Sequence, residues 1–483
     1  MDAPVKGERI INYIYEAIGH TPMLRLQKIP KDEGIECEIL AKCEFMNPGG
    51  SVKDRVSMEM FLQAETEGRI KPGDTVVEAT SGNAGIGFCL MAACKGYKMV
   101  ITIPDRMSLE KISVLKSLGA EVIRTPSGVP GSHPASSYSM ARTIQKERPN
   151  SHNLDQYVNP ANPNAHYKTT GQEIFEDCGG KLDYVFMGVG TGGTITGVSR
   201  KLKELNPNIK IIGIDPMGSI MAEPMTLNTV KKGFHVEGIG HDFIPDVLDR
   251  STVDSWVKTD DAETFRYARD LISKEGLLSG ASSGSVVEGM VKYLKEHGLD
   301  KNPNVRCVII LPDSIRNYLS KFCSDDWMVK KGFYEPSKLL NSTHPLYGMR
   351  VSDLGLVPVM HFEEKNTIKE ALDYFSRGEM AAPIFQDGKL VGLATRQSVM
   401  HGLLNKTLKP SDSITKAVSK EVVSVDYETD VSIFDALLKT EEVVFATKQG
   451  THDRCKEVYA VTPLEIIKLL NRVISETEET NSN

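Results

Sequence analysis

Asn47-Pro48-Gly49-Gly50-Ser51-Val52-Lys53-Asp54-Arg55 is the most distinctive motif of this sequence. The two glycines predict a tight turn. Ser51, with Asp54 three residues later, predicts a capped helix start. Lys53 then falls at the second helical position, where unpaired amides and the helix dipole disfavour a cation. We expect this placement to lower the pKa of Lys53 and to make its amine a better nucleophile. On its own, the stretch more often marks a capped helix with a solvent-exposed lysine.

Composition limits the classes of protein that this chain can belong to. Its 483 residues suit two or three domains, and 40% hydrophobic with 25% charged residues is ordinary for a globular protein. A net charge of -7 without a basic run argues against nucleic acid or membrane as partner. No apolar run approaches the ~20 residues of a membrane span. The N-terminus lacks the apolar core of a signal peptide. The eight scattered cysteines include no Cys-x-x-Cys pair, so we expect no metal site and a reducing, cytoplasmic location.

Short apolar strands alternate with helices over the first two thirds of the chain. The predicted strands cover residues 37–42, 75–79, 99–103, 121–124, 183–189, 209–214 and 305–311. This alternation predicts βαβ units and a mainly parallel sheet. A first helix is expected over residues 10–18, and residues 153–167 read as a polar connection between helices.

The pattern changes after residue 328. Residues 329–348 read as a linker between a first domain, 1–328, and a C-terminal module, 349–475. Two halves of this module, about 349–405 and 411–475, share the order strand–helix–strand–strand–helix, which predicts a paired repeat. The acidic tail, residues 476–483, is expected to be disordered.

Gly190-Thr191-Gly192-Gly193-Thr194 connects a predicted strand to a predicted helix. Its amides and the helix dipole suit a phosphate group. Gly188, Gly190 and Gly193 also spell Gly-x-Gly-x-x-Gly, and Asp215 follows 22 residues after Gly193, where a ribose-binding acid of a dinucleotide site would stand. A purely structural turn is a third interpretation, and all three remain open on this pattern.

Three further stretches open helices or form loops with polar groups. Ser81-Gly82-Asn83 could hold a carboxylate, although alone it is more often an N-cap. The run 279–285, which contains Ser282, is a second serine-rich N-cap. The loop Glu237 to Pro245 offers acidic and imidazole groups, and His241 alone is more often structural than a ligand.

Together these motifs resemble the fold-type II pyridoxal-phosphate enzymes, in the β-replacement branch. The 237–245 loop, the stretch 311–318 and the C-terminal repeat narrow the resemblance to the cystathionine β-synthase family. The resemblance implies an α/β catalytic domain of two three-layer α/β/α subdomains, followed by a tandem pair of CBS (β-α-β-β-α) modules. It also implies a homodimer.

The resemblance assigns roles to individual residues. Those implied to bind the cofactor, pyridoxal 5'-phosphate, are Lys53 through a Schiff base, Asn83, Gly190, Thr191, Gly192, Gly193, Thr194 and, at the pyridine nitrogen, Ser282. Those implied to bind substrate are Thr80, Ser81, Gln156, Gly240 and His241. Those implied to take part in catalysis are Lys53, Ser81, Glu237 and His241.

The implied reaction is the first step of transsulfuration. L-Serine would lose its β-hydroxyl to give an aminoacrylate, and L-homocysteine would add to form L-cystathionine. Cysteine in place of serine would release hydrogen sulfide. The rivals are cysteine synthase, which uses O-acetylserine and sulfide, a nicotinamide-binding oxidoreductase, and a nucleotide sensor built on the C-terminal pair.

Four departures from the family pattern shape the expectations. Residues 1–9 contain no Cys or His, so we predict no haem. A Cys-x-x-Cys of some members is replaced at residues 206–209. His241 stands where animal members carry Tyr, which adds O-acetylserine to the expected substrates. Met380, Ala381 and Glu465 replace polar ligand positions of the sensing repeats, so S-adenosylmethionine is expected to bind weakly or not at all.

Overall fold

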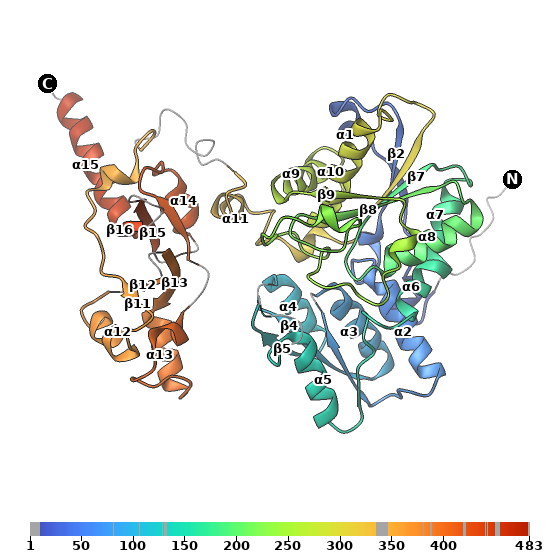
Figure 1. Cartoon of the computed structure of the whole chain (residues 1–483), viewed down its shortest axis with the longest axis horizontal. Helices are drawn as coiled ribbons and strands as arrows, with labels where there is room; N and C mark the ends of the chain where they lie inside the picture. The colour runs from blue at the N-terminus through green and yellow to red at the C-terminus, as the bar shows by residue number, and fades with distance from the viewer. Residues whose placement is uncertain are drawn as a thin grey trace. The chain divides into compact units, whose positions relative to one another are not determined.

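The computed structural model describes residues 10–80, 82–105, 107–127, 129, 133–334, 346–379, 381–386, 389–418, 422–439, 441, 443–449 and 455–481. The chain divides into two compact units, Met1–Cys323 and Ser324–Asn483, and each is described by itself (Figure 1).

The larger sheet of the first unit has six strands in the order β1-β2-β10-β7-β8-β9. The strands are β1 (Met23–Arg25), β2 (Glu38–Lys42), β10 (Arg306–Ile310), β7 (Tyr184–Gly188), β8 (Lys210–Pro216) and β9 (Ser255–Thr259). Neighbours run parallel except β1, which is antiparallel to β2. Because parallel neighbours cannot be joined by a hairpin, the chain returns across a face of the sheet between strands.

The smaller sheet has four parallel strands in the order β5-β4-β3-β6. They are β5 (Glu121–Thr125), β4 (Lys98–Pro104), β3 (Thr75–Ala79) and β6 (Ser151–His152). β6 pairs with β3 over only two residues, and the chain then leaves the sheet. This early departure of β6 shapes one wall of the candidate site.

Helices supply the outer layers of the first unit. They are α1 (Lys28–Asp32), α2 (Lys53–Thr66), α3 (Asn83–Lys95), α4 (Leu109–Ser117), α5 (Ser137–Glu147), α6 (Ala161–Ala165), α7 (Gly171–Asp177), α8 (Gly193–Leu205), α9 (Asp261–Ser273) and α10 (Ala281–Glu296). Short turns complete the list: η1 (Ile14–Ala17), η2 (Glu44–Met46), η3 (His166–Thr170), η4 (Met225–Leu227), η5 (Arg250–Thr252) and η6 (Ile315–Asn317). All are 3-10 turns except η3, which is a π-turn.

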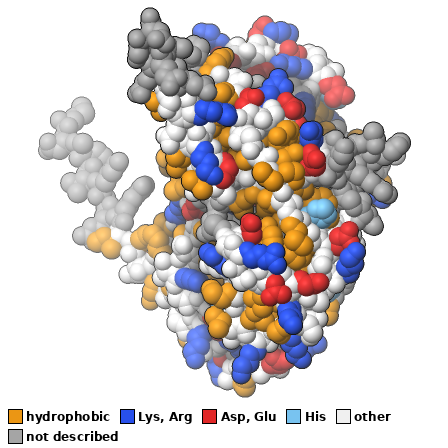
Figure 2. Space-filling model, turned by 90° about the vertical axis from the view of Figure 1, so that its left-hand side faces the viewer, with side chains coloured by type: hydrophobic (Ala, Val, Ile, Leu, Met, Phe, Trp, Pro, Cys, Tyr) orange, Lys and Arg blue, Asp and Glu red, His pale blue; other side chains and the backbone are white. Residues whose placement is uncertain are grey.

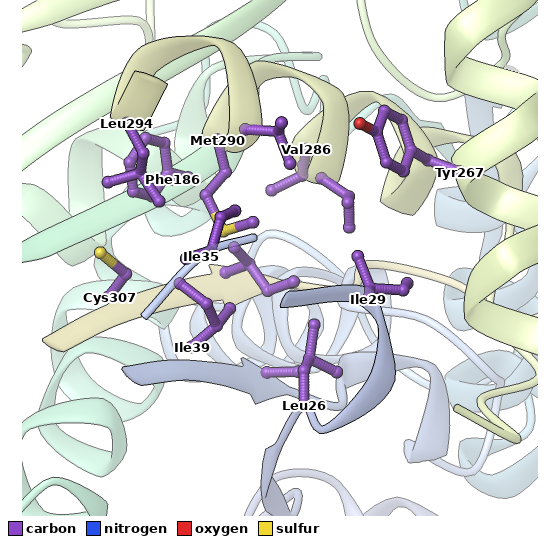
Figure 3. Close-up of a cluster of buried hydrophobic side chains, with 14 of the residues drawn as sticks. Leu26, Ile29, Ile35, Ile39, Phe186, Tyr267, Val286, Met290, Leu294 and Cys307 are labelled. Atoms are coloured by element: carbon purple, nitrogen blue, oxygen red, sulfur yellow. The ribbon is translucent and has the colours of Figure 1, made fainter. Parts of the chain in front are cut away.

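Both sheets are buried on both faces. In the larger sheet, Ile39 and Phe186 pack with α9 and α10 on one side (Figure 3). Their neighbours Leu40 and Val185 pack with α7 and α8 on the other. In the smaller sheet, one face packs with α2, α3 and α4, and the other with α5. Successive side chains of a strand point to opposite faces, so the continuous apolar runs of the sequence follow from this double burial. The predicted three-layer α/β/α architecture is confirmed.

The second unit contains two three-stranded sheets, β11-β12-β13 and β14-β15-β16. The first repeat comprises η8 (Val351–Leu354), β11 (Phe362–Glu363), α12 (Ile368–Phe375), β12 (Ala381–Gln386), β13 (Lys389–Thr395) and α13 (Arg396–Leu404). The second comprises η9 (Ile414–Ala417), β14 (Ser424–Asp426), α14 (Ile433–Leu437), β15 (Val444–Gln449), β16 (Cys455–Val461) and α15 (Pro463–Asn481). The order β-α-β-β-α therefore occurs twice, as predicted for a tandem CBS pair.

Several local expectations differ from the structure. The helix expected over residues 10–18 is only the turn η1, because its apolar side chains, such as Ile10 and Ile14, stay exposed and give it no packing support. The polar connection 153–167 contains α6 and the start of η3. Strand β9 was not predicted from the sequence pattern. Helix α11 (Asp325–Lys330) enters the predicted linker, and α15 continues into the predicted acidic tail.

Candidate active site

Lys53 is the first residue of α2, and Val52 occupies the capping position. Ser51 Oγ accepts the Lys53 N–H at 3.2 Å. Asp54 instead accepts the Gly49 N–H at 2.5 Å, so the expected capping box does not close. Among the described residues, no hydrogen bond or ion pair reaches Lys53 Nζ. Burial lowers the pKa of Lys53 to about 8, against the opposing effect of Asp313. Desolvation is thus the main cause of the lowered pKa.

The loop from Gly190 to Thr194 joins β7 to α8 and, with Lys53, lines a small cavity of about 30 Å³. A Cβ on Gly193 would lie 1.9 Å from Asn162 Oδ1, so only glycine lets α8 start this close to α6. Free backbone amides at the first turn of a 13-residue helix provide an anion site. The loop has the geometry of a phosphate cup.

A larger cavity of about 420 Å³ shares Lys53 and Thr191 with the small one. Most of the sequence-predicted site residues line it, namely Lys53, Thr80, Asn83, Gln156, Thr191, Glu237, Gly240, His241 and Ser282. Gly190, Gly192 and Thr194 line the small cavity, and Gly193 begins α8 beside it. Ser81 lies outside the described residues. The structure therefore brings together side chains from distant parts of the chain around one amine.

Asn83, at the start of α3, is held at both ends of its amide. Its Nδ2 donates to Asp313 Oδ2 at 2.6 Å, and its Oδ1 accepts from Asn317 Nδ2 at 2.9 Å. Tyr318 also donates its hydroxyl to Asp313. Burial raises the pKa of Asp313, opposed chiefly by Lys111. Asn83 has a second N–H besides the one given to Asp313, because an amide nitrogen carries two.

Gln156 owes its place to two residues that had no motif signal. Glu78, in β3, accepts the N–H of Asp155 at 3.2 Å and that of Gln156 at 3.1 Å. Asn162 Nδ2 donates to Gln156 O at 2.7 Å and to Thr191 Oγ1 at 3.0 Å. The Glu78 carboxyl thus accepts backbone N–H groups just beyond the point where β6 stops pairing with β3. Burial raises the pKa of this carboxyl to about 8. Asn162 thus ties the loop that carries Gln156 to the loop from Gly190 to Thr194.

Ser282 lies in the first turn of α10 and is buried in the cavity wall. Thr80, at the carboxyl end of β3, is also buried, and its hydroxyl accepts the Gly82 N–H at 3.1 Å. Thr80 lies there because the carboxyl ends of parallel strands meet at one edge of a sheet. The start of α10 follows α9 instead, and the Gly280 N–H holds it by donating to Asp313 O, just after β10, at 2.8 Å.

Glu237 lines the cavity as an ionised carboxylate. Lys111 Nζ lies 2.6 Å from Oε2, and Lys321 Nζ lies 3.0 Å from Oε1. Burial raises the pKa of Glu237, but the two ammonium groups outweigh this effect and hold the pKa below its usual range. Lys111 is fully buried and also lies 4.5 Å above the Tyr318 ring. The pattern of the sequence gave no sign of either lysine.

His241 belongs to an aromatic cluster at the cavity. Its ring centroid lies 5.5 Å from that of Tyr157 and 5.0 Å from that of Phe243, and Tyr138 lies 5.1 Å from Tyr157. Its backbone is fixed by Ser219, whose Oγ accepts the His241 N–H at 3.0 Å and donates to its carbonyl at 3.1 Å. The cluster joins α5 to two loops around the larger cavity.

The dinucleotide interpretation of the glycine pattern fails at Asp215. That side chain is fully buried, and its Oδ2 lies 2.6 Å from Lys258 Nζ. A carboxylate held in this way is not available to a ribose. Among the described residues, no group of three or more His, Cys, Asp or Glu side chains could hold a metal ion.

Comparison with known proteins agrees with this geometry. A family model described as pyridoxal-phosphate dependent enzyme matches residues 14–313. Cystathionine beta-synthase of Oryctolagus cuniculus is 48% identical over 422 residues, which are 87% of this chain and 76% of that protein. Cystathionine beta-synthase of Dictyostelium discoideum is 47% identical over 414 residues, which are 85% of this chain and 82% of that protein. Cystathionine beta-synthase of Saccharomyces cerevisiae is 45% identical over 411 residues, which are 81% of this chain and 81% of that protein.

Two solved structures are similar to the chain. A hydrogen sulfide-producing enzyme from Fusobacterium nucleatum matches with a TM-score of 0.59 and 35% identity, covering 64% of this chain and 100% of the other. An O-acetylserine dependent cystathionine beta-synthase from Helicobacter pylori matches with a TM-score of 0.60 and 33% identity, covering 65% of this chain and 99% of the other.

The fold and the residues around Lys53 define a pyridoxal-phosphate-dependent enzyme of fold type II. Within that class, the chain belongs to the cystathionine β-synthase family.

The residues present fit this cofactor. The glycine loop before α8 leaves room for a phosphate, and the small cavity adjoins an amine that has no partner among the described residues. Ser282 and Asn83 present a neutral hydroxyl and an amide in the wall of the adjacent cavity. An amine with a pKa near 8 has a much larger neutral fraction at neutral to mildly alkaline pH than an ordinary lysine, and Schiff-base chemistry needs the neutral form.

Proposed function

We propose that this enzyme condenses L-serine with L-homocysteine to give L-cystathionine and water. The observation that carries the proposal is the position of Lys53. Its amine lies where a glycine-lined phosphate cup meets a larger cavity lined by amide, hydroxyl and aromatic groups. In this family the cofactor supplies an electron sink for the bond-breaking at the amino acid.

We propose that the following residues hold the cofactor. The amides of Gly190 to Thr194, with the hydroxyls of Thr191 and Thr194, would bind its phosphate. Lys53 Nζ would hold its aldehyde carbon. The second Asn83 N–H would bind the ring oxygen, and Ser282 Oγ would meet the pyridine nitrogen. Because a hydroxyl is neutral, it leaves that nitrogen largely unprotonated and moderates the electron sink.

The other predicted residues would act on substrates. Thr80, Ser81 and Gln156 would hold the carboxylate of the first amino acid. Lys53 Nζ, once released, would take the proton from its α-carbon. Glu237, Gly240 and His241 would form the side that receives the thiol. Since Glu237 is paired with two lysines, its contribution there is a fixed charge rather than a proton.

Product analysis tests the proposal directly. With serine and homocysteine, the protein loaded with pyridoxal phosphate should form cystathionine, and Lys53→Ala should abolish it. The loaded protein should also be yellow and lose this colour on borohydride reduction, whereas Lys53→Ala should not form the reducible adduct. Cystathionine formation by Lys53→Ala, or a colourless wild-type protein, would contradict the proposal.

O-Acetylserine and cysteine are further candidates for the first substrate. The Helicobacter pylori neighbour is named for O-acetylserine, and the Fusobacterium nucleatum neighbour for hydrogen sulfide. We propose that cysteine in place of serine gives cystathionine and hydrogen sulfide. O-Acetylserine with sulfide, which would give cysteine and acetate, is the alternative reaction, and the same product analysis separates them.

For the C-terminal module, we propose that S-adenosylmethionine binds weakly or not at all. The Glu465 carboxylate accepts both the N–H and the hydroxyl of Thr462, as a cap of α15, and this occupies the group that stands where an aspartate would hold a ribose. Ala381 is buried at the start of β12, and Met380 lies outside the described residues. Calorimetry showing micromolar binding with activation would refute this.

The remaining proposals concern the domain boundaries, the oligomeric state and the cellular location of the protein. We propose a catalytic domain of residues 1–328, a linker 329–348 and a tandem module 349–475, in a homodimer without haem. The seven cysteines of the first unit, from Cys37 to Cys323, are free thiols, which suits a reducing, cytoplasmic setting. No described helix could cross a membrane. Acidic and basic side chains are interspersed on the face in Figure 2, which offers no continuous basic surface to nucleic acid there.

A further inference from the structure

His166 is a fully buried histidine in the π-turn η3, directly behind the phosphate cup. Its Nδ1 lies 2.9 Å from Thr170 Oγ1, and its Nε2 lies 3.1 Å from Thr194 Oγ1. Thr194 lines the small cavity, whereas His166 does not. Each ring nitrogen therefore faces one hydroxyl, and one of these hydroxyls belongs to the proposed phosphate site.

Close packing between two helical segments brings this contact about. A Cβ on Gly197 would lie 2.1 Å from Pro163 O and 2.7 Å from His166 Cβ. Thr194 and Gly197 are three residues apart in α8, so they share a face of that helix. The missing side chain at Gly197 lets η3 approach α8 and places the imidazole beside Thr194. π-Turns of this kind occur frequently at functional sites.

The imidazole is neutral in this environment. Burial, with Lys53 and Arg55 as neighbouring positive charges, lowers the pKa of His166 well below its usual range. A neutral imidazole has one N–H donor and one acceptor nitrogen. Two arrangements are then available, and they differ in the direction of the Thr194 hydroxyl hydrogen.

Only one arrangement serves a phosphate. If Nε2 accepts, the Thr194 hydrogen points at the ring, and the hydroxyl offers no donor to the cavity. If Nε2 carries the hydrogen, it donates to Thr194 Oγ1, and the Thr194 hydrogen is free to point at the cavity. Thr170 then donates to Nδ1. A phosphate has only acceptors at neutral pH, so the second arrangement gives it one more charge-assisted hydrogen bond.

We propose that His166 is a positioning residue of the phosphate cup, which as the Nε2–H tautomer turns the Thr194 hydroxyl hydrogen toward the cofactor phosphate. The inference rests on the proposed placement of that phosphate at Gly190 to Thr194. It adds a residue that touches neither the cofactor nor the substrate.

Two isosteric substitutions separate the two sides of the ring. In His166→Gln the side-chain amide nitrogen reaches the position of Nε2 and keeps a donor for Thr194. In His166→Asn the shorter amide reaches only the position of Nδ1 and loses Thr194. Thr169→Val is the matched control, because the Thr169 hydroxyl lies in the same turn but donates to Ala165 O at 2.7 Å.

The test measures pyridoxal phosphate binding by equilibrium dialysis and the ³¹P chemical shift of the bound phosphate. His166→Asn should bind the cofactor about five- to tenfold more weakly, as expected for one lost hydrogen bond, and shift the ³¹P signal. His166→Gln and Thr169→Val should stay close to wild type in both. Combined with Thr194→Val, His166→Asn should add little, because both remove the same bond.

The outcomes distinguish this inference from the proposed function. If wild type binds no pyridoxal phosphate, the proposed function falls and this inference falls with it. If wild type binds but His166→Asn leaves affinity and ³¹P shift unchanged, only the role of His166 is overturned. If His166→Asn and His166→Gln lose the same amount of cofactor affinity, and if these losses add to that of Thr194→Val, then His166 has a packing role. That result would also overturn the proposed role of His166.

Discussion

Lys53 shows how a predicted pKa shift can have a different main cause from the one expected. From the sequence, the helix dipole was the reason to expect a low pKa. In the structure the pKa is lowered to about 8, chiefly because the amine is desolvated between the two cavities. The position of a residue in a helix can be predicted from its neighbours in the sequence, whereas its burial depends on residues far away in the chain. Asp313, which opposes the shift, lies 260 residues from Lys53.

The low pKa of Lys53 predicts a pH-dependent stability in the cofactor-free protein. Below pH 8 the amine is protonated in both folded and unfolded chains, and the folded chain bears the cost of a buried charge. Between pH 8 and about 10.5 the unfolded chain binds the proton and the folded chain does not, so stability rises with pH. Lys53→Met should therefore raise the melting temperature at pH 7, with a gain on the order of 1–3 kcal/mol that shrinks above pH 8. Thermal unfolding from pH 7 to 10 measures it.

Lys53→Arg serves as the matched control for this effect. A guanidinium keeps its charge throughout the range, so this variant should lose stability relative to wild type as the pH rises above 8. A Lys53→Met gain that is constant from pH 7 to 10 would contradict the explanation by burial.

At the level of single residues, the sequence predicted the groups that lie in glycine-rich or serine-rich helix starts. These motifs carry a local signal, because a tight turn and a cap restrict the residue types. Glu78, Lys111 and Asn162 carry none, since each lies inside an ordinary strand or helix. Each acts only after the two sheets have brought separate segments together. An acidic residue in an otherwise apolar strand, such as Glu78, is the one hint that could have been followed.

At the level of elements, α2 is anchored by a buried charge cluster that sequence patterns did not reveal. Arg55 donates to Glu44 of η2 at 2.7 Å and to Glu173 of α7 at 2.6 Å, and all three are largely buried. Lys42 also contacts Glu173 at 3.0 Å. The cluster fixes the start of α2, and with it the backbone of Lys53, against two other elements.

Arg55→Met should therefore destabilise the first unit strongly. It leaves two carboxylates without their shared partner in a buried place, which typically costs about 3–5 kcal/mol. The exposed pair Arg69–Glu67 offers a matched control, and Arg69→Met should change stability by about 0.5 kcal/mol or less. Urea unfolding of both variants measures the difference. Equal effects of the two substitutions would show that the buried cluster has no special weight.

The order of elements was easier to predict than their ends. Apolar runs that are buried on both faces, such as Met99–Ile101 in β4 and Cys307–Ile310 in β10, are conspicuous because consecutive residues are apolar. The segment 153–167 was missed because its Asn and Pro residues have low helix propensity. There α6 and η3 form because they pack against α8, whose glycines admit them. Tertiary packing, which no local pattern contains, decided this region.

At the level of the whole molecule, each unit has its own cores. In the first unit they lie on both faces of the two sheets. In the second they lie within each repeat and between the repeats. The proposed cofactor site belongs entirely to the first unit. A chain built in this way should unfold in two steps, since neither core needs the other to bury its apolar surface.

The two tryptophans of the chain make this testable, because Trp256 lies in β9 of the first unit and Trp327 in α11 of the second. Trp327→Phe leaves Trp256 as the reporter of the first unit, and Trp256→Phe leaves Trp327 as the reporter of the second. In urea, the fluorescence transitions of the two variants should have different midpoints. Saturating pyridoxal phosphate should raise the Trp256 midpoint, because a ligand stabilises the unit that binds it, and leave the Trp327 midpoint unchanged. Coincident transitions that shift together with the cofactor would show that the chain unfolds as one cooperative body.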